Sequence, residues 1–225
     1  MTFEITHRFT RDTLFVCDVK NLKEAVEKAV SSGTNLEGVN LFYVDLTNAI
    51  LEGANIPNAN MVGADLPYTN LTGANMCGAN LARANMPRVN LARAKLSDAD
   101  LSGANMKGAN LSGTNLSGTN LSGANLSGAN LSGANLSGAN LSGANLDGET
   151  LFITPISINN LYWPVLITAE YMRIGCQRHK HEEWAAFGND IINKMHRQAL
   201  NFWALWKAPL MLMCDTHKLL ANEVK

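Results

Sequence analysis

The sequence predicts a mainly β solenoid, in which the chain turns a corner every five residues, flanked by two modules without repeats. Three observations support this prediction. The stretch Leu121–Asn145 repeats the five residues LSGAN, and every fifth residue from Leu36 to Leu151 is Leu, Ile or Met. All four tryptophans lie after the repeats, which indicates a separate module with its own core.

A period of five suits neither an α-helix nor a continuous strand. In a helix, five residues turn through about 500°, so the leucines would spiral around the axis instead of forming one face. In a strand, side chains alternate with period two, so an odd spacing would place successive leucines on opposite faces. A path that bends in every repeat returns each leucine to the inside.

A second, smaller apolar position keeps the same phase. The residue two positions before each central residue is Ala, Thr or Val from Thr34 to Ala144, and Glu149 is the first exception. We therefore expect one large and one small side chain per repeat to point into the core.

The corner residues are typical of tight turns. In Leu-Ser-Gly-Ala the third residue is Gly, which supplies the positive φ of a type II turn. We expect a different turn where Gly is replaced, at Tyr43, Asn48, Asn58, Tyr68, Arg83, Arg88, Arg93 and Asp98. Pro57, Pro67 and Pro87 all directly follow a central residue, where the fixed φ of proline fits a turn.

The pattern A-(N/D)-L-x-x, from about Thr34 to Leu151, resembles the pentapeptide-repeat family. The resemblance implies a right-handed quadrilateral parallel β-helix with four repeats to a coil. With coils stacked at about 4.8 Å, the array would form a rod roughly 29 Å long. Ile50 and Lys95 depart from the usual Asn or Asp, and Glu149 and Thr150 mark the end of the array.

Composition narrows the class of protein. The formal net charge is −1, so we expect no general attraction to nucleic acid or to an anionic membrane. The N-terminus has no signal segment, and the apolar run Pro209–Cys214 is too short to span a bilayer. The four cysteines are irregularly spaced, so a disulfide framework is not expected. We predict a cytoplasmic protein, in a bacterial host cell.

Residues 1–33 predict a cap made of a strand and a helix. Leu14–Val19 reads as a strand, and Asn21 with Glu24 resembles a capping box that opens a helix. Gly33 is placed to stop that helix. Such a module would cover the first coil, which otherwise exposes an unpaired edge.

Residues 152–225 predict an α+β module. Trp163–Thr168 and Tyr171–Ile174 read as two strands joined by a short turn. Apolar residues from Ile191 to Trp206 follow helical spacing, and Pro209 is expected to open a last helix. The polar stretch Gln177–Glu183 reads as a solvated loop. Both flanking modules resemble those of pentapeptide-repeat proteins from bacteriophages and prophages, which implies a bacterial or viral origin but no activity.

Two chemical sites are conceivable in the C-terminal module. Cys176, His179, Cys214 and His217 form two C-x-x-H units that could complete a tetrahedral zinc site. The simpler interpretation is that Cys214 is a buried hydrophobe and that His179 lies in a loop. A catalytic arrangement of Cys176, a histidine and Asp215 is weaker, because nothing in the sequence places these side chains together. We predict no cofactor apart from this zinc alternative.

Two groups of side chains could form interaction surfaces. Arg83, Arg88 and Arg93 would occupy equivalent corners of successive sides, forming a positive belt for an acidic partner or a solvated surface that keeps rods apart. Trp203 and Trp206 are core residues or a surface for a dimer or partner. The repeated asparagines are better explained by structural hydrogen bonds than by ligand recognition.

We therefore expect a non-enzymatic protein that binds a host or phage protein through its rigid rod and its C-terminal module. One alternative comes from quinolone-resistance members of the family, whose rod resembles a DNA duplex and occupies the DNA site of a type II topoisomerase. A mimic of this length would need about 17 negative charges, whereas the array has eight acidic and five basic residues. The other alternative is a zinc-binding or catalytic C-terminal module, with the solenoid as a spacer.

Overall fold

The computed structural model describes residues 1–146, 149–150, 156–158, 161, 165–168, 170–175, 177–196 and 198–224. These residues fall into two compact units, Met1–Thr150 and Leu151–Lys225. The first unit contains the N-terminal cap and the repeats together. Within the described residues, no helix combines the length and the apolar character needed to cross a bilayer.

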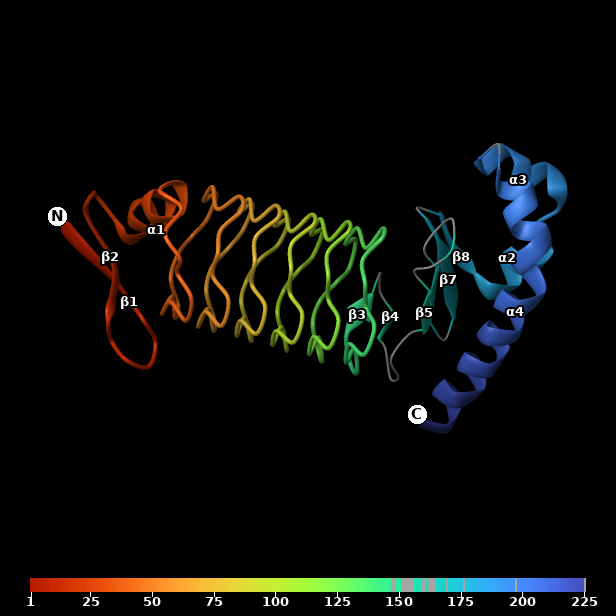
Figure 1. The fold of residues 1–225 in the computed structure, drawn as a ribbon. Helices are drawn as coiled ribbons and strands as arrows, with labels where there is room; N and C mark the ends of the chain where they lie inside the picture. Colours follow the sequence, from red (N-terminus) through yellow and green to blue (C-terminus); the bar gives the residue numbers. More distant parts are fainter. Residues whose placement is uncertain are drawn as a thin grey trace. The chain divides into compact units, whose positions relative to one another are not determined.

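The repeats wind into a four-sided helix. Parallel β-bridges join each outward residue to the one 20 positions later, from Asn40 with Asn60 to Asn125 with Asn145, so four repeats make one coil. Figure 1 shows these coils stacked along one axis. The expected coil of four repeats is therefore observed.

The core of this helix consists of the two predicted inward positions. Every central residue from Leu36 to Leu146 is at most 6% exposed. The smaller residues two positions earlier are buried from Val39 to Ala144, and the hydroxyls of the buried threonines are hydrogen-bonded: that of Thr114 donates to the carbonyl oxygen of Leu91 at 2.8 Å. Stacked asparagines bond along the sides, as from Asn105 Nδ2 to Asn85 Oδ1 at 3.1 Å.

The backbone conformation at the corners contradicts one prediction from the sequence. All eight residues that replace Gly adopt the same left-handed conformation as the glycines, with φ between 53° and 59°. The prediction of a different turn at these positions was wrong, because the hydrogen bonds between coils impose one backbone path on every corner. Arg83 N, for example, donates to Ser102 O at 2.8 Å, as Gly103 N does to Ser122 O.

The N-terminal cap is an antiparallel hairpin, β1 (Thr2–Thr6) and β2 (Thr13–Asp18), followed by α1 (Leu22–Ser31). The predicted strand and helix are confirmed, and β1 is an additional strand. Asn21 caps α1 by accepting from Glu24 N at 2.8 Å, and Gly33 follows the helix with φ 73°.

The cap binds directly to the first coil. Asn40 N donates to Thr6 O at 2.9 Å and Arg8 N to Gly38 O at 2.8 Å, so the hairpin pairs with the edge of the coil. From α1, the side chain of Lys23 donates to Thr47 O at 2.8 Å. The cap thus occupies hydrogen-bonding groups that an open solenoid end would expose. At the other end, β3 (Asn145–Leu146) pairs antiparallel with β4 (Glu149–Thr150).

The second unit is a four-stranded antiparallel sheet with helices. Its strand order is β5-β6-β7-β8, with bounds Ile156–Ile158, Val165–Ile167, Tyr171–Ile174 and Gln177–Lys180. The predicted hairpin corresponds to β6 and β7, whereas its first residues, Trp163 and Pro164, lie outside the described residues. Helix α2 (His181–Ala186), α3 (Asn189–Met195) and α4 (Ala199–Val224) follow.

Three predictions about this unit were wrong. The stretch Gln177–Glu183 is not a loop: it forms β8 and the start of α2, because β8 pairs with β7. The single helix expected over 191–206 is divided into α3 and α4. Pro209 lies inside α4 instead of opening it, and it is exposed, so water can replace the hydrogen bond that its missing N–H would make to Leu205.

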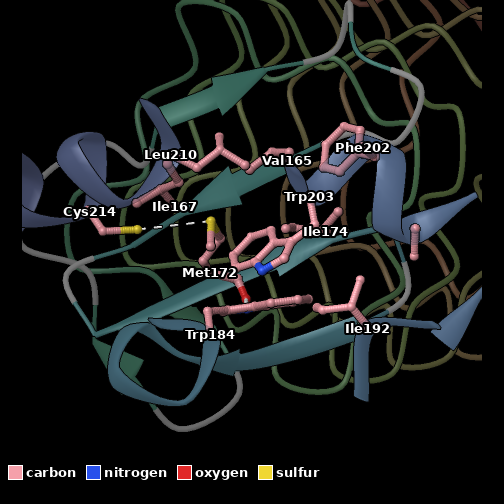
Figure 2. Packing of buried hydrophobic residues seen from close by; sticks show 11 residues of the cluster. Val165, Ile167, Met172, Ile174, Trp184, Ile192, Phe202, Trp203, Leu210 and Cys214 are labelled. Carbon is pink, nitrogen blue, oxygen red and sulfur yellow. Dashed lines mark hydrogen bonds between the residues drawn. The ribbon is translucent and has the colours of Figure 1, made fainter. Parts of the chain in front are cut away.

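The core of the second unit lies between its sheet and its helices. Figure 2 shows Trp184 and Trp203 beside Met172, with Ile167, Leu210 and Cys214 in the same cluster. Trp184 Nε1 donates to Met172 O at 2.6 Å, and the centroids of the two indole rings are 5.3 Å apart. Aromatic side chains therefore join the sheet to α2 and α4.

Candidate interaction surfaces

One coil differs from all others in its corners. The coil of residues 81–100 places Arg83, Arg88, Arg93 and Asp98 at its four corners, with φ between 56° and 59°. All four side chains are exposed. The next coil has Gly at every equivalent position, from Gly103 to Gly118. Arginine rarely adopts a left-handed conformation, which costs about 1–2 kcal/mol per residue, so this coil stores strain that its neighbour avoids.

The arginine side chains extend toward the next coil. A Cβ atom added to Gly108 would lie 3.4 Å from Arg88 Cγ, and the corresponding distance from Gly103 to Arg83 Cγ is 3.7 Å. The stems therefore lie along the corners, over the glycines that follow. This packing places the guanidinium groups on the surface of the rod and limits their freedom.

Arg88 is also held from the preceding coil. Its guanidinium Nη1 donates to the hydroxyl of Tyr68 at 3.3 Å, and its Cζ lies 5.7 Å from the centroid of the Tyr68 ring. Tyr68 is the equivalent corner residue 20 positions earlier, with φ 59° and 56% exposure. A cation stacked on an aromatic ring is pre-oriented for binding, because it loses less freedom on contact with a partner.

A pair of exposed aromatic rings lies at an earlier corner. Phe42 and Tyr43 are 55% and 66% exposed, and their ring centroids are 4.3 Å apart in an edge-to-face arrangement. Tyr43 packs over Gly63, where an added Cβ would lie 2.5 Å from Tyr43 Cε1. Tyr43 and Arg83 therefore belong to one corner, and Tyr68 and Arg88 to the next.

These side chains lie at or beside three of the four corners on the first part of the rod, and together they are called the corner surface below. It consists of Phe42, Tyr43, Tyr68, Arg83, Arg88 and Arg93. Tyrosine and arginine are the residues enriched at binding hot spots. By contrast, residues 108–146 contain no charged residue, and every corner from Gly103 to Gly143 is Gly.

The proposed zinc ligands do not all fall within the described residues, because Cys176 lies outside them. His179, on β8, packs edge-on against Trp184 and Phe187, with ring centroids 5.2 and 4.9 Å away. Cys214 lies in α4 with its Sγ 3.9 Å from Met172 Sδ. Within the described part of the chain, no three Cys, His, Asp or Glu residues are grouped so that they could hold a metal ion.

Burial shifts the pKa values of Cys214 in α4 and of His181 in α2. It raises the pKa of the Cys214 thiol to about 12, so the thiol stays protonated near neutral pH and is a poor nucleophile or metal ligand. His217, on the same helix, is 3% exposed, and His181 at the start of α2 is 8% exposed. Burial also lowers the pKa of His181, aided by the charges of Lys218 and His217.

The two tryptophans of the predicted partner surface have different positions. Trp203 is 4% exposed and packs against Trp184 with the ring planes tilted by 41°, so it stabilises the core and presents no surface. Trp206 is partly buried against the same cluster. The exposed apolar residues of α4 are instead Leu205, Leu212, Leu219 and Leu220, which sequence reasoning missed. The seven-residue spacing of Leu205, Leu212 and Leu219 could have indicated an apolar stripe on one helix face.

A family model described as pentapeptide repeats matches the chain in 8 copies, over residues 32–56, 51–82, 69–108 and 109–148. A comparison with curated proteins gives no match. Among solved structures, a pentapeptide repeat protein from the thylakoid lumen of Arabidopsis thaliana is 30% identical over 40% of this chain, with a TM-score of 0.39, and the chain covers 62% of its length.

Two further structures are similar. The pentapeptide repeat protein Rfr23 from the cyanobacterium Cyanothece is 35% identical, over 51% of this chain and 85% of its own, with a TM-score of 0.38. The plasmid-mediated fluoroquinolone resistance protein QnrB1 is 18% identical, over 50% of this chain and 73% of its own, with a TM-score of 0.25. The family model alone covers more than half of the chain.

Proposed function

Because the chain belongs to the pentapeptide-repeat family, whose members fold as right-handed quadrilateral β-helices, we propose that it is a non-enzymatic scaffold that binds another protein through the corner surface. The partner would present acidic groups that reach around the belt formed by Arg83, Arg88 and Arg93. The observation that carries this proposal is the left-handed conformation of these three arginines, where the neighbouring coil uses Gly.

Strain of this kind indicates a function because the coils that follow residue 100 avoid it, with Gly at every corner from Gly103 to Gly143. The next coil makes the same four turns with glycine and keeps the same hydrogen bonds between coils. The arginines are therefore not needed for the turns. Residues held in unfavourable backbone conformations cluster at binding sites, where the gain in binding offsets their cost. Arg88 stacked on Tyr68 supplies a pre-oriented cation beside an exposed aromatic ring.

Charge argues against the alternative of a DNA mimic. A duplex carries one charge per about 1.7 Å, so the roughly 10 Å of rod formed by residues 108–146 would need about six negative charges. This segment has none. The corner surface on the preceding coils is positive, opposite in sign to a phosphate backbone. No observation favours a type II topoisomerase over another protein partner.

Quantitative affinity capture tests the proposal. We would immobilise the full-length protein, pass a bacterial lysate over it and compare the recovered proteins with those of two variants. We choose a bacterial lysate because the flanking segments resemble those of phage proteins, and we propose that the interaction takes place in the bacterial cytoplasm. Arg83→Gly/Arg88→Gly/Arg93→Gly removes the positive corners without removing a turn. Asp98→Gly is the matched control, since it relaxes the fourth corner of the same coil and keeps the arginines.

The proposal expects a protein that is recovered by the wild type and by Asp98→Gly, and at least tenfold less by the triple variant. A partner that binds all three proteins equally would show that the arginines are only a solvated surface. Removal of residues 152–225 as a second comparison reports whether the C-terminal module contributes to the same interaction.

A further inference from the structure

Helix α4 exposes a line of leucines that nothing in the chain's described residues covers. Leu205, Leu212 and Leu219 are 75%, 68% and 66% exposed, and we call them the leucine seam. Leu220 beside them is 51% exposed. Single exposed leucines are common on protein surfaces, but an aligned set on one helix face is typical of an interaction site.

Helix geometry places the seam opposite the buried face of α4. Residues seven apart differ by only about 20° around a helix, so the three leucines form one stripe. Each leucine follows a buried residue by two positions, or about 200°: Trp203, Leu210 and His217 are 4%, 0% and 3% exposed. One stripe therefore anchors α4 to its own module, and the other is free to contact another helix.

We propose that the occupant of the leucine seam is the same seam of a second copy of this chain. A residue that recurs every seven positions returns to nearly the same side of a helix, so two helices can keep contact along the whole seam. A second copy presents this spacing in register with the first, so a two-fold axis pairs all three leucines at once. The inference goes beyond the proposed function, because the corner surface lies in the other unit of the chain.

A charge beside the seam favours antiparallel helices. In a parallel pair, exposed Asp215, which lies about 60° around the helix from the seam, would lie opposite the partner's Asp215. In an antiparallel pair centred on Leu212, Leu205 meets the partner's Leu219. The two Asp215 residues are then separated by about 9 Å along the axis, so their repulsion weakens.

The surface area that two copies of α4 can bury indicates how stable the dimer should be. Helix α4 has 26 residues, so it is about 39 Å long and about 12 Å wide with its side chains. Two such strips would bury roughly 900 Å² in total, slightly less than the ~1,200 Å² at the lower limit of stable interfaces. Interfaces of this size are typical of weak, transient complexes, so we expect a reversible dimer.

Dimerisation would give the protein two rods in one assembly. If each rod carries a corner surface, a partner with two acidic patches binds with a higher apparent affinity than a single rod provides. The dimer itself needs no such partner, so it can be measured with the purified protein alone.

Sedimentation velocity of the full-length protein between about 1 and 200 μM tests the proposal. We expect the wild type to change from monomer to dimer across this range. Leu212→Lys places two charges at the centre of the seam and should remain monomeric throughout. Ile50→Lys is the matched control, because Ile50 is a 67% exposed apolar residue on the rod, and it should dimerise like the wild type.

Circular dichroism checks that each variant keeps its fold, and a more conservative variant, Leu212→Ala, should weaken the dimer about tenfold without adding charge. A wild type that is monomeric at 200 μM would contradict the assignment and leave the helix of another protein as the occupant. A dimer that survives unchanged in folded Leu212→Lys would place the contact elsewhere.

Cross-linking tests the antiparallel arrangement. A mixture of Leu205→Cys and Leu219→Cys should form more cross-linked dimer than either variant alone, whereas preferential linking of each variant to itself would contradict the antiparallel arrangement.

Discussion

Replacing the strained arginines by glycine should stabilise the rod. Arg83 and Arg93 have φ of 58° and 59°, where a residue with a Cβ pays about 1–2 kcal/mol. Glycine avoids this cost but adds about 0.4–1 kcal/mol of conformational entropy to the unfolded chain. The net gain is about 0.5–1 kcal/mol for each of these two sites.

Arg88→Gly should behave differently. This substitution also removes the stacking on Tyr68 and the hydrogen bond to its hydroxyl, and an exposed cation–π contact contributes about 0.5–1 kcal/mol. The gain and the loss cancel, so we expect a change near zero. Asn48→Gly should also have little effect, because asparagine tolerates the left-handed conformation better than arginine does.

Thermal unfolding followed by circular dichroism measures these differences. For a protein of this size, 1 kcal/mol shifts the melting temperature by about 2–4 °C, so Arg83→Gly/Arg93→Gly should raise the transition of Met1–Thr150 by roughly 3–6 °C. A lower melting temperature for the double variant would refute the reasoning, since it would mean that the arginines stabilise the coil. An equal gain for Asn48→Gly would show that strain at arginine is not the cause.

Three further predictions concern other parts of the chain. Gly63→Ala should lower the melting temperature of the rod more than Gly73→Ala, because both have positive φ but only the first would meet the ring of Tyr43, whereas Gly73 has open space. Equal losses would argue against the Tyr43 contact. Thr114→Val keeps the buried shape but removes a hydroxyl that donates to a carbonyl of the preceding coil, so urea unfolding should show a loss of about 1–2 kcal/mol; an unchanged midpoint would contradict this. Burial holds the pKa of His181 below its ordinary value of 6.5, so the unfolded chain binds the proton more readily; stability of the C-terminal unit is then fully present above pH 6.5 and is lost as the pH falls from 6.5 toward the folded pKa. Unfolding measured between pH 7.5 and 5 should show this loss, and His181→Gln should reduce it, whereas the same slope in the variant would exclude His181 as its cause.

The repeats were predictable because one local pattern determines their structure. Each repeat supplies its own large and small inward residues and its own turn, so the sequence indicated the buried positions from Leu36 to Leu146 directly. The conformation of the non-glycine corners was not predictable from local preferences. Arginine alone disfavours positive φ, and only the hydrogen bonds to the next coil, such as that from Arg83 N to Ser102 O, impose it.

The C-terminal module was harder to predict because its contacts are long-range. The strand β8 is polar and became visible only through its pairing with β7, which joins Met172 to His179. Pro209 normally marks the start of a helix, but here packing of Leu210 and Cys214 in the core continues α4 through it. The leucine seam could have been predicted from the sequence, since a seven-residue spacing is a local pattern.

The most direct test of the account is the affinity of the captured partner for two charge variants of the same coil. Arg83→Glu/Arg93→Glu reverses two corners, and Asp98→Arg completes a ring of four positive corners. We predict that the first variant binds at least tenfold more weakly than the wild type, whereas the second binds as tightly or more tightly. Equal affinities for both variants would contradict the claim that these corners are a binding surface.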